Sequence, residues 1–136
     1  MTGVQTCALP ISQSVPVHEA DLADVAAVAL LDRTGAHLGR AYVVTGPERL
    51  TLAQQVAEIG RATGREIRVE QISEEEAAEA MVGRYLTKEA ALELVRMFGA
   101  TVDAPPFPVS DAVEQVTGRP ARTFARWAED HAADFS

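Results

Sequence analysis

Ala41-Tyr42-Val43-Val44-Thr45-Gly46-Pro47 is the stretch that decides the fold class of this chain. Its first five residues are typical of a strand, and Gly46-Pro47 can neither extend a strand ladder nor start a helix interior. Because the run is continuously apolar up to Thr45, it indicates a strand buried on both faces, as in a parallel sheet. Helical patterns on both sides of this strand therefore predict an α/β fold.

The segment after this strand carries two helix start signals of the same kind. Thr51 with Gln54, and Ser73 with Glu76, have the spacing of a capping box, in which each side chain accepts a hydrogen bond from the other residue's backbone. Between the two helices, residues 67–70 alternate as a half-exposed strand should. The helices predicted along the whole chain cover about residues 21–31, 51–64, 73–85, 88–98, 110–117 and 122–135.

The segment before the strand contains a histidine that we consider as a site residue. Val15-Pro16-Val17-His18 reads as a short extended piece, because Pro16 biases the residue before it away from the helical region. Asp21 then stands where it can cap the helix that follows. His18 lies at a strand end just before a helix, where ligand sites gather, with core packing as its alternative role. Since His18, Glu19 and Asp21 point in different directions, we expect no metal site here.

The composition excludes several classes of function. The chain has 136 residues, a net charge of −8 and one cysteine. This acidic balance disfavours nucleic-acid partners, which attract clustered Lys and Arg. No apolar run approaches the roughly 20 residues of a membrane span. One cysteine excludes an internal disulfide framework and a cysteine-based zinc cluster. We therefore expect a soluble cytoplasmic protein with no nucleic-acid partner and no membrane partner.

The sequence contains no motif that binds a nucleotide. Neither G-x-G-x-x-G nor a Walker A pattern occurs. Tyr85 and Lys88 are three positions apart, so the Tyr-x-x-x-Lys pair of short-chain dehydrogenases is also absent. His131 shares a helical turn with Asp130 and Asp134, but it belongs to the apolar stripe of the last helix and we interpret it as a packing residue. The chain is thus expected to carry no catalytic, cofactor-binding or metal-binding residue.

The order and spacing of several short motifs resemble one known family. These motifs are Pro16–Ala26, Gly39–Glu48, Leu50-Thr51 at a helix start, Thr63–Ile67, and Val116–Phe124 followed by Trp127. Together they resemble the C-terminal part of NmrA-like proteins, which are atypical short-chain dehydrogenases/reductases that bind NAD(P). The resemblance covers about Val15 to Phe135.

This resemblance implies a Rossmann-type NAD(P)-binding fold with a small helical substrate lobe. The family's nucleotide fingerprint lies at its N-terminus, and this chain has no such segment. By resemblance, residues 41–45 are a late strand of the sheet and residues 51–136 form the substrate lobe. The implied activity is reduction of quinone, azo or carbonyl-type small-molecule substrates by NADPH or NADH in the parent protein. The alternative is a non-catalytic NAD(P)-sensing regulator that acts through a protein partner.

For the chain alone, the absent fingerprint leads us to expect neither a bound cofactor nor catalysis. The substrate-pocket candidates are His18, Tyr85 and Phe98, with core packing as the alternative for each. His18 is chosen for its place at a strand end. The other two are chosen because they lie on the helices of the expected lobe.

The first eleven residues resemble something other than a protein family. The run from Val4 to Ile11 reads VQTCALPI, which is similar to the translation of a sequencing adapter. Residues 1–11 also have neither helical nor strand periodicity. We therefore expect a non-native tail over residues 1–11, a native chain from about Ser12, and no meaning for Cys7.

Overall fold

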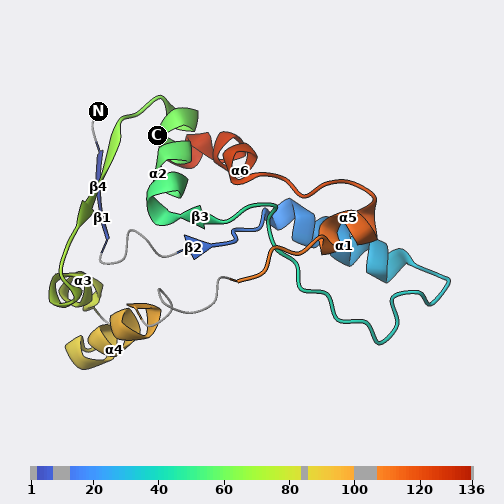
Figure 1. Cartoon of the computed structure of the whole chain (residues 1–136), viewed down its shortest axis with the longest axis horizontal. Helices are drawn as coiled ribbons and strands as arrows, with labels where there is room; N and C mark the ends of the chain where they lie inside the picture. The colour runs from blue at the N-terminus through green and yellow to red at the C-terminus, as the bar shows by residue number, and fades with distance from the viewer. Residues whose placement is uncertain (1–2, 8–12, 84–85, 100–106, 136) are drawn as a thin grey trace.

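The computed structural model describes residues 3–7, 13–83, 86–99 and 107–135 of the chain. The molecule is elongated, and its helices follow one another in pairs along the long axis (Figure 1). α3 packs on α4 at one end, α2 on α6 in the middle, and α1 on α5 at the other end. The helices are α1 (Glu19–Leu31), α2 (Leu52–Thr63), α3 (Glu74–Met81), α4 (Lys88–Gly99), α5 (Ala112–Thr117), α6 (Phe124–Asp130) and the 3-10 turn η1 (Ala132–Phe135).

Two small sheets connect these helix pairs. β1 (Gly3–Cys7) runs parallel to β4 (Ile67–Gln71), with Gly3 opposite Ile67 and Cys7 opposite Gln71. β2 (Gln13–Ser14) pairs antiparallel with β3 (Leu50–Thr51). Residues 3–7 therefore form a strand although residues 1–11 show no strand periodicity in the sequence. The backbone N–H and C=O groups of β4 need partners, and a neighbouring segment can supply them whatever its side-chain pattern.

The strand predicted at residues 41–45 is also wrong. Residues 41–46 lie in neither a helix nor a strand, and no described strand runs beside them. A strand exists only through a hydrogen-bonded neighbour, so a β-rich run without one stays irregular. A side chain holds this segment instead, because the Thr45 hydroxyl accepts a hydrogen bond from the Ser110 amide at 2.9 Å. The mixed α/β character of the fold comes from β4 and the helices around it.

Local signals explain where α2 and α3 begin. The Thr51 hydroxyl accepts a hydrogen bond from the Gln54 amide at 3.2 Å, and the Gln54 side chain accepts one from the Thr51 amide at 2.7 Å. Ser73 and Glu76 make the same pair of bonds at the start of α3. Gly64 ends α2 with a φ of +66°, a conformation that favours glycine. Both predicted capping boxes are therefore confirmed.

The start of α1 differs from the prediction. The N-cap is His18, whose Nδ1 accepts a hydrogen bond from the Ala20 amide at 3.1 Å, and Asp21 lies inside the first turn. Asp21 does not cap the helix, and its carboxylate instead accepts hydrogen bonds from Arg122, 101 positions later in the chain. The last predicted helix is also shorter than expected, since α6 ends at Asp130 and the chain continues in η1.

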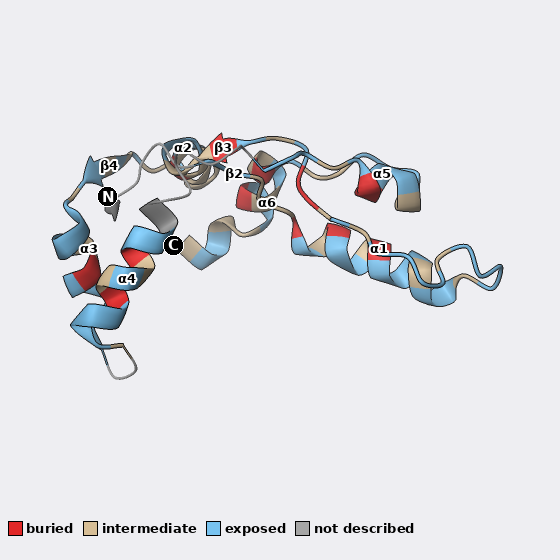
Figure 2. Ribbon diagram, turned by 60° about the horizontal axis from the view of Figure 1, so that its bottom comes forward, coloured by how far each residue is buried: buried red, intermediate tan, exposed pale blue. Residues whose placement is uncertain are grey.

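The apolar core is divided among the helix pairs rather than gathered in one place, as Figure 2 shows. Ala78 of α3 packs with Ala91 and Val95 of α4. Elsewhere the buried apolar residues are Val25, Leu50, Val56, Ala112, Val113, Phe124 and Ala128. Large apolar side chains remain exposed where α1 ends, with Leu30 84% and Leu31 77% exposed. Within the described part of the chain, no helix has the length and apolar character needed to cross a membrane.

Candidate functional site

Of the three residues predicted to line a substrate pocket, only His18 can be placed. Its side chain is 5% exposed, and it caps α1 as described above. Tyr85 lies outside the described residues, and the backbone of Phe98 lies in α4 while its side chain is outside the described part. The role of the three residues in a pocket therefore stays a prediction.

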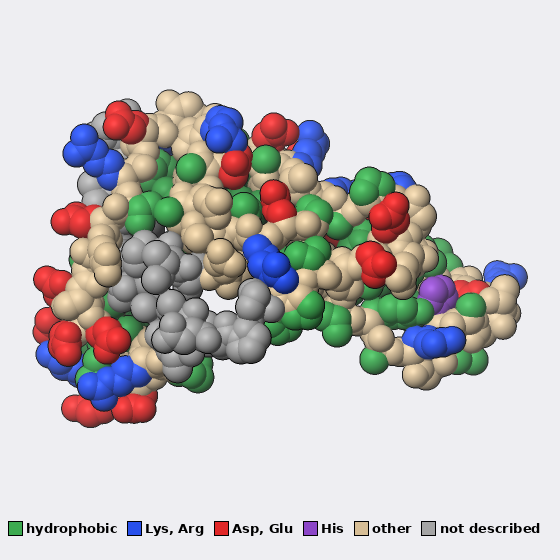
Figure 3. Space-filling view, viewed as in Figure 1, with side chains coloured by type: hydrophobic (Ala, Val, Ile, Leu, Met, Phe, Trp, Pro, Cys, Tyr) green, Lys and Arg blue, Asp and Glu red, His purple; other side chains and the backbone are tan. Residues whose placement is uncertain are grey.

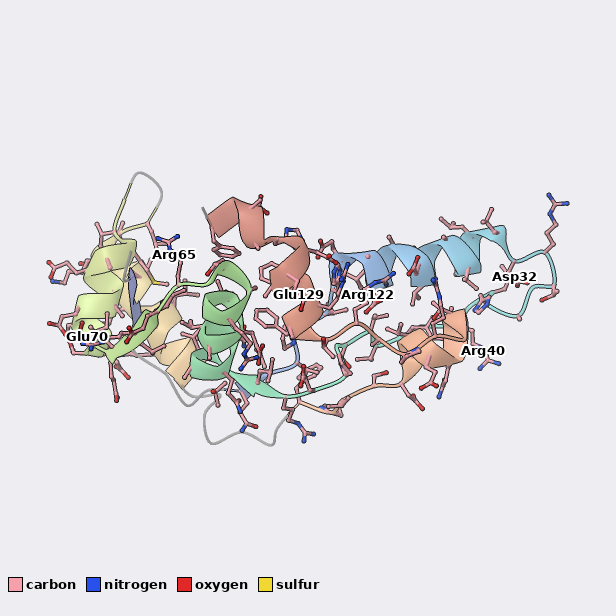
Figure 4. All side chains as sticks on the ribbon, turned by 90° about the horizontal axis from the view of Figure 1, so that it is seen from above. Asp32, Arg40, Arg65, Glu70, Arg122 and Glu129 are labelled. Atoms are coloured by element: carbon pink, nitrogen blue, oxygen red, sulfur yellow. The ribbon has the colours of Figure 1, made fainter. Side chains whose placement is uncertain are left out.

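The most buried charge in the described part of the chain is the Asp21 carboxylate, which is 1% exposed. One of its oxygens accepts a hydrogen bond from the Arg122 backbone amide at 2.7 Å, and the other pairs with the Arg122 guanidinium. The same guanidinium donates to Asp24 at 2.9 Å. Hydrogen bonds to Asp24 and Asp21 hold the pKa of Arg122 above its usual range. Figure 4 shows Arg122 against α1, so α1 is fastened to the segment that leads into α6.

These charges line an open depression of about 290 Å³ between α1, α5 and the 118–122 segment. Arg119 completes its charged rim by pairing with Asp24 at 3.2 Å. Two carboxylates thus face two guanidiniums, and neither arginine is left unpaired to bind a phosphate. We interpret the Asp21–Asp24–Arg119–Arg122 group as a structural lock.

A second open depression, of about 470 Å³, lies beside Pro47. Its lining residues are Pro47, Val109, Ser110, Asp111, Val113, Glu114, Pro120 and Ala121. Two of them carry carboxylates and none carries a basic side chain, which disfavours a ligand bearing phosphates. His18 lines neither of the two depressions.

The beginning of α1 also meets the end of the chain through a group of side chains that we name the histidine cluster: His18, Glu19, Asp130, His131 and Asp134. His131 Nε2 lies 2.6 Å from a Glu19 oxygen, and its Nδ1 lies 2.9 Å from an Asp134 oxygen. His18 Nε2 lies 3.4 Å from Asp130. Hydrogen bonds to Asp134 and Glu19 raise the pKa of His131, and the pKa of Glu19 is lowered by its own backbone amide and then by His131.

Sequence reasoning identified only part of the histidine cluster. His131 does contact the apolar stripe, because its ring centroid lies 4.8 Å from that of Trp127. Its pairing with Glu19 was missed, since the two residues are 112 positions apart and no local pattern connects them. Among the described residues, no group of three or more His, Cys, Asp or Glu side chains is arranged to hold a metal ion.

Acidic side chains gather over α3 and α4, at the end of the molecule away from α1 and α5 (Figure 3). Glu74, Glu75, Glu76 and Glu79 of α3 are all exposed. Hydrogen bonds from the backbone and then the side chain of Ser73 lower the pKa of Glu76, so it stays ionised in its capping role. This end therefore presents negative charge, which repels anionic ligands such as nucleotides.

Comparison with known proteins gives a consistent class of relatives. No family model matches the chain. It is 39% identical over 124 residues to the (4-alkanoyl-5-oxo-2,5-dihydrofuran-3-yl)methyl phosphate reductase of Streptomyces griseus, covering 89% of this chain and 43% of that protein. It is 42% identical over 120 residues to the NAD(P)H azoreductase of Xenophilus azovorans, covering 85% of this chain and 41% of that protein.

A solved structure agrees with these relatives. The NADPH-dependent quinone oxidoreductase of Escherichia coli superposes with a TM-score of 0.71 at 25% identity, over 98% of this chain and 47% of that one. That enzyme is also known in complex with NADPH. The homologues are thus NAD(P)H-dependent reductases, and the fold matches that of an NAD(P)-binding reductase. The chain spans less than half the length of the proteins it matches.

Proposed function

We propose that this chain is the substrate-side part of an NAD(P)H-dependent oxidoreductase that acts on quinone, azo or other carbonyl-type acceptors. One observation carries the proposal: most of the chain aligns with reductases of this kind, while it spans less than half of their length. The nucleotide, when bound to the parent enzyme, supplies the hydride. This chain's share of the work is then to support and enclose the acceptor.

The described residues do not fit a dinucleotide by themselves. Phosphate groups are bound by unpaired cations or by backbone amides of a glycine-rich turn at a helix N-terminus. Arg119 and Arg122 are held by carboxylates, and the larger depression is lined by Asp111 and Glu114 without a basic side chain. We therefore place the nucleotide on a part of the parent enzyme outside this sequence, and assign no step of hydride transfer to these residues.

A chimera tests the proposal. Residues 13–135 replace the aligned segment of the Xenophilus azoreductase, and NADPH oxidation is followed with a naphthoquinone and an azo dye as acceptors. The matched control carries the aligned segment of the Streptomyces reductase. We expect the chimera to bind NADPH and to turn over at least one acceptor. Tight NADPH binding without turnover of any acceptor, in a chimera whose matched control is active, would contradict the proposal and favour an NAD(P)-sensing regulator.

The chain alone provides a second test. Because Arg119 and Arg122, which line the charged depression, are paired with carboxylates, we expect the isolated chain to show no NADPH binding by calorimetry and no NADPH oxidation with any acceptor. Micromolar affinity for NADPH would refute the placement of the nucleotide outside this sequence. Variants Tyr85→Phe and Phe98→Leu, made in the chimera, should change KM for the acceptor and leave KM for NADPH unaltered if these residues line the pocket.

A further inference from the structure

The histidine cluster joins two parts of the chain that are far apart in sequence. His18 and Glu19 belong to the start of α1, and their partners lie at the end of α6 and in η1. Figure 4 shows α6, with Glu129 labelled, meeting α1 at this point. His18 stays a predicted pocket residue, but the proposed function gives no role to Glu19, Asp130, His131 and Asp134, so their arrangement needs an account of its own.

Hydrogen-bond geometry indicates the charge state of His131. Both ring nitrogens of His131 face carboxylate oxygens, at 2.6 Å and 2.9 Å. A neutral imidazole has one N–H, so it would leave a nitrogen lone pair against a carboxylate, and only the imidazolium satisfies both contacts. In His18 the Nδ1 atom accepts from the Ala20 amide and lies 3.5 Å from a Glu19 oxygen, while Nε2 faces Asp130 at 3.4 Å. Within the cluster, His131 is therefore the residue whose protonation decides whether both carboxylate contacts are satisfied.

The groups around His131 favour its charged form. Glu19 faces it from α1 and Asp134 from η1, while the His18 ring lies 6.3 Å away between centroids. On α6, Asp130 is occupied by Arg126 at 2.6 Å. Arg65, which follows the end of α2, donates to the Phe135 carbonyl rather than to a member of the cluster.

We propose that the histidine cluster is a pH-dependent clasp, which fastens η1 and the end of α6 to the start of α1 while His131 is protonated and releases them when it is not. Loss of the proton removes the attraction to two carboxylates at once and leaves one ring nitrogen without a donor for its partner. The contact is local and partly exposed, so release frees the end of the chain without unfolding the helix pairs.

The direction of the effect follows from the pKa shifts. The pKa of His131 is raised above its ordinary 6.5, so the clasp is fully formed below about 6.5 and is lost as the pH rises through the raised value. The pKa of Glu19 is lowered from 4.5, so its carboxylate stays charged on the acidic side until the pH falls below that value. The clasp is therefore closed in mildly acidic solution and opens as the solution becomes alkaline.

Trp127 is a built-in reporter for the test, because it is the one tryptophan in the sequence and its ring lies 4.8 Å from that of His131. A protonated imidazole in contact with indole quenches its fluorescence, and a neutral one does so much less. Emission of the 136-residue chain, titrated from about pH 5.5 to about pH 9, should rise with a midpoint above 6.5. Glu19→Gln should move the midpoint toward 6.5, and His131→Gln should abolish the transition.

Glu129→Gln is the matched control, since Glu129 lies on α6, is exposed and pairs with Arg126 instead of His131. This variant should keep the midpoint of the unmodified chain. Hydrogen exchange of residues 132–135, corrected for intrinsic rates, should show protection falling about two- to fivefold through the same midpoint. A midpoint at or below 6.5, an unchanged midpoint in Glu19→Gln, or protection that does not vary with pH would overturn the clasp. None of these readouts depends on reductase activity.

Discussion

Replacing Asp21 by Asn tests the contact that fastens α1 to the C-terminal segment. The carboxylate is 1% exposed and accepts from the Arg122 amide at 2.7 Å and from the Arg122 guanidinium. Asparagine has nearly the same shape and keeps one acceptor oxygen for the backbone amide. Its NH₂ group, however, must face the guanidinium, which is itself a donor, so the charge-assisted bond is lost.

The size of the effect can be worked out from these two bonds. Removing one partner of a fully buried ion pair costs about 3–5 kcal/mol. Here the guanidinium is 33% exposed and keeps Asp24 as an acceptor, so the loss is close to that of one hydrogen bond to a charged group plus part of a desolvation penalty. We expect Asp21→Asn to lower the free energy of unfolding by about 2–3 kcal/mol, or roughly 30- to 150-fold in the unfolding equilibrium.

Urea unfolding followed by Trp127 fluorescence and by circular dichroism measures this difference. Asp24→Asn is the matched control, because Asp24 is 32% exposed and its loss leaves the Asp21 contact in place. The control should cost no more than about 1 kcal/mol. The reasoning is refuted if Asp21→Asn costs less than about 0.5 kcal/mol, or if Asp24→Asn is the more damaging change.

The remaining predictions concern a helix cap and a close backbone approach. Thr51→Ala should cost about 1 kcal/mol in urea unfolding, because it removes the acceptor for the Gln54 amide, while Thr51→Ser should stay near the unmodified chain; equal stability of the two variants would mean that the cap contributes nothing. Gly46→Ala should cost at least about 2 kcal/mol, because the added Cβ would lie 1.9 Å from the Pro16 carbonyl oxygen. Gly83→Ala, which meets nothing within 4 Å, is its control. A Gly46→Ala chain as stable as Gly83→Ala would show that the 41–47 segment does not lie against residue 16.

Features that depend on a few consecutive residues could be predicted from the sequence. The capping boxes at Thr51 and Ser73 are confirmed because donor and acceptor are three positions apart and the helix itself sets their distance. Gly64 and Gly118 end helices with positive φ for the same local reason. The alternation in residues 67–70 predicted the half-exposed strand β4 equally well.

Contacts between residues far apart in the chain could not be predicted from the sequence. Asp21 has the composition and position of a helix cap, yet its carboxylate is taken by Arg122, 101 positions later. The N-cap of α1 is instead His18, a residue type outside the usual Ser, Thr, Asp and Asn caps. Likewise, the Glu19–His131 pair exists only because α6 ends beside the start of α1. In both cases the side-chain chemistry could be read from the sequence, but its partner could not.

The failed strand at residues 41–45 follows the same logic and bears on the proposed function. Its apolar pattern fits burial between two neighbours, but Val43 is 58% exposed and no described strand runs beside it. Leu30, Leu31 and Leu38 are exposed as well, at 77–84%. Single exposed apolar residues are ordinary in proteins. Several of them together with an unpaired β-rich run form an apolar surface whose burial would stabilise the fold. A parent enzyme about twice as long, as proposed, would supply that cover, and in the chimera the backbone amides of residues 41–45 should become protected from hydrogen exchange.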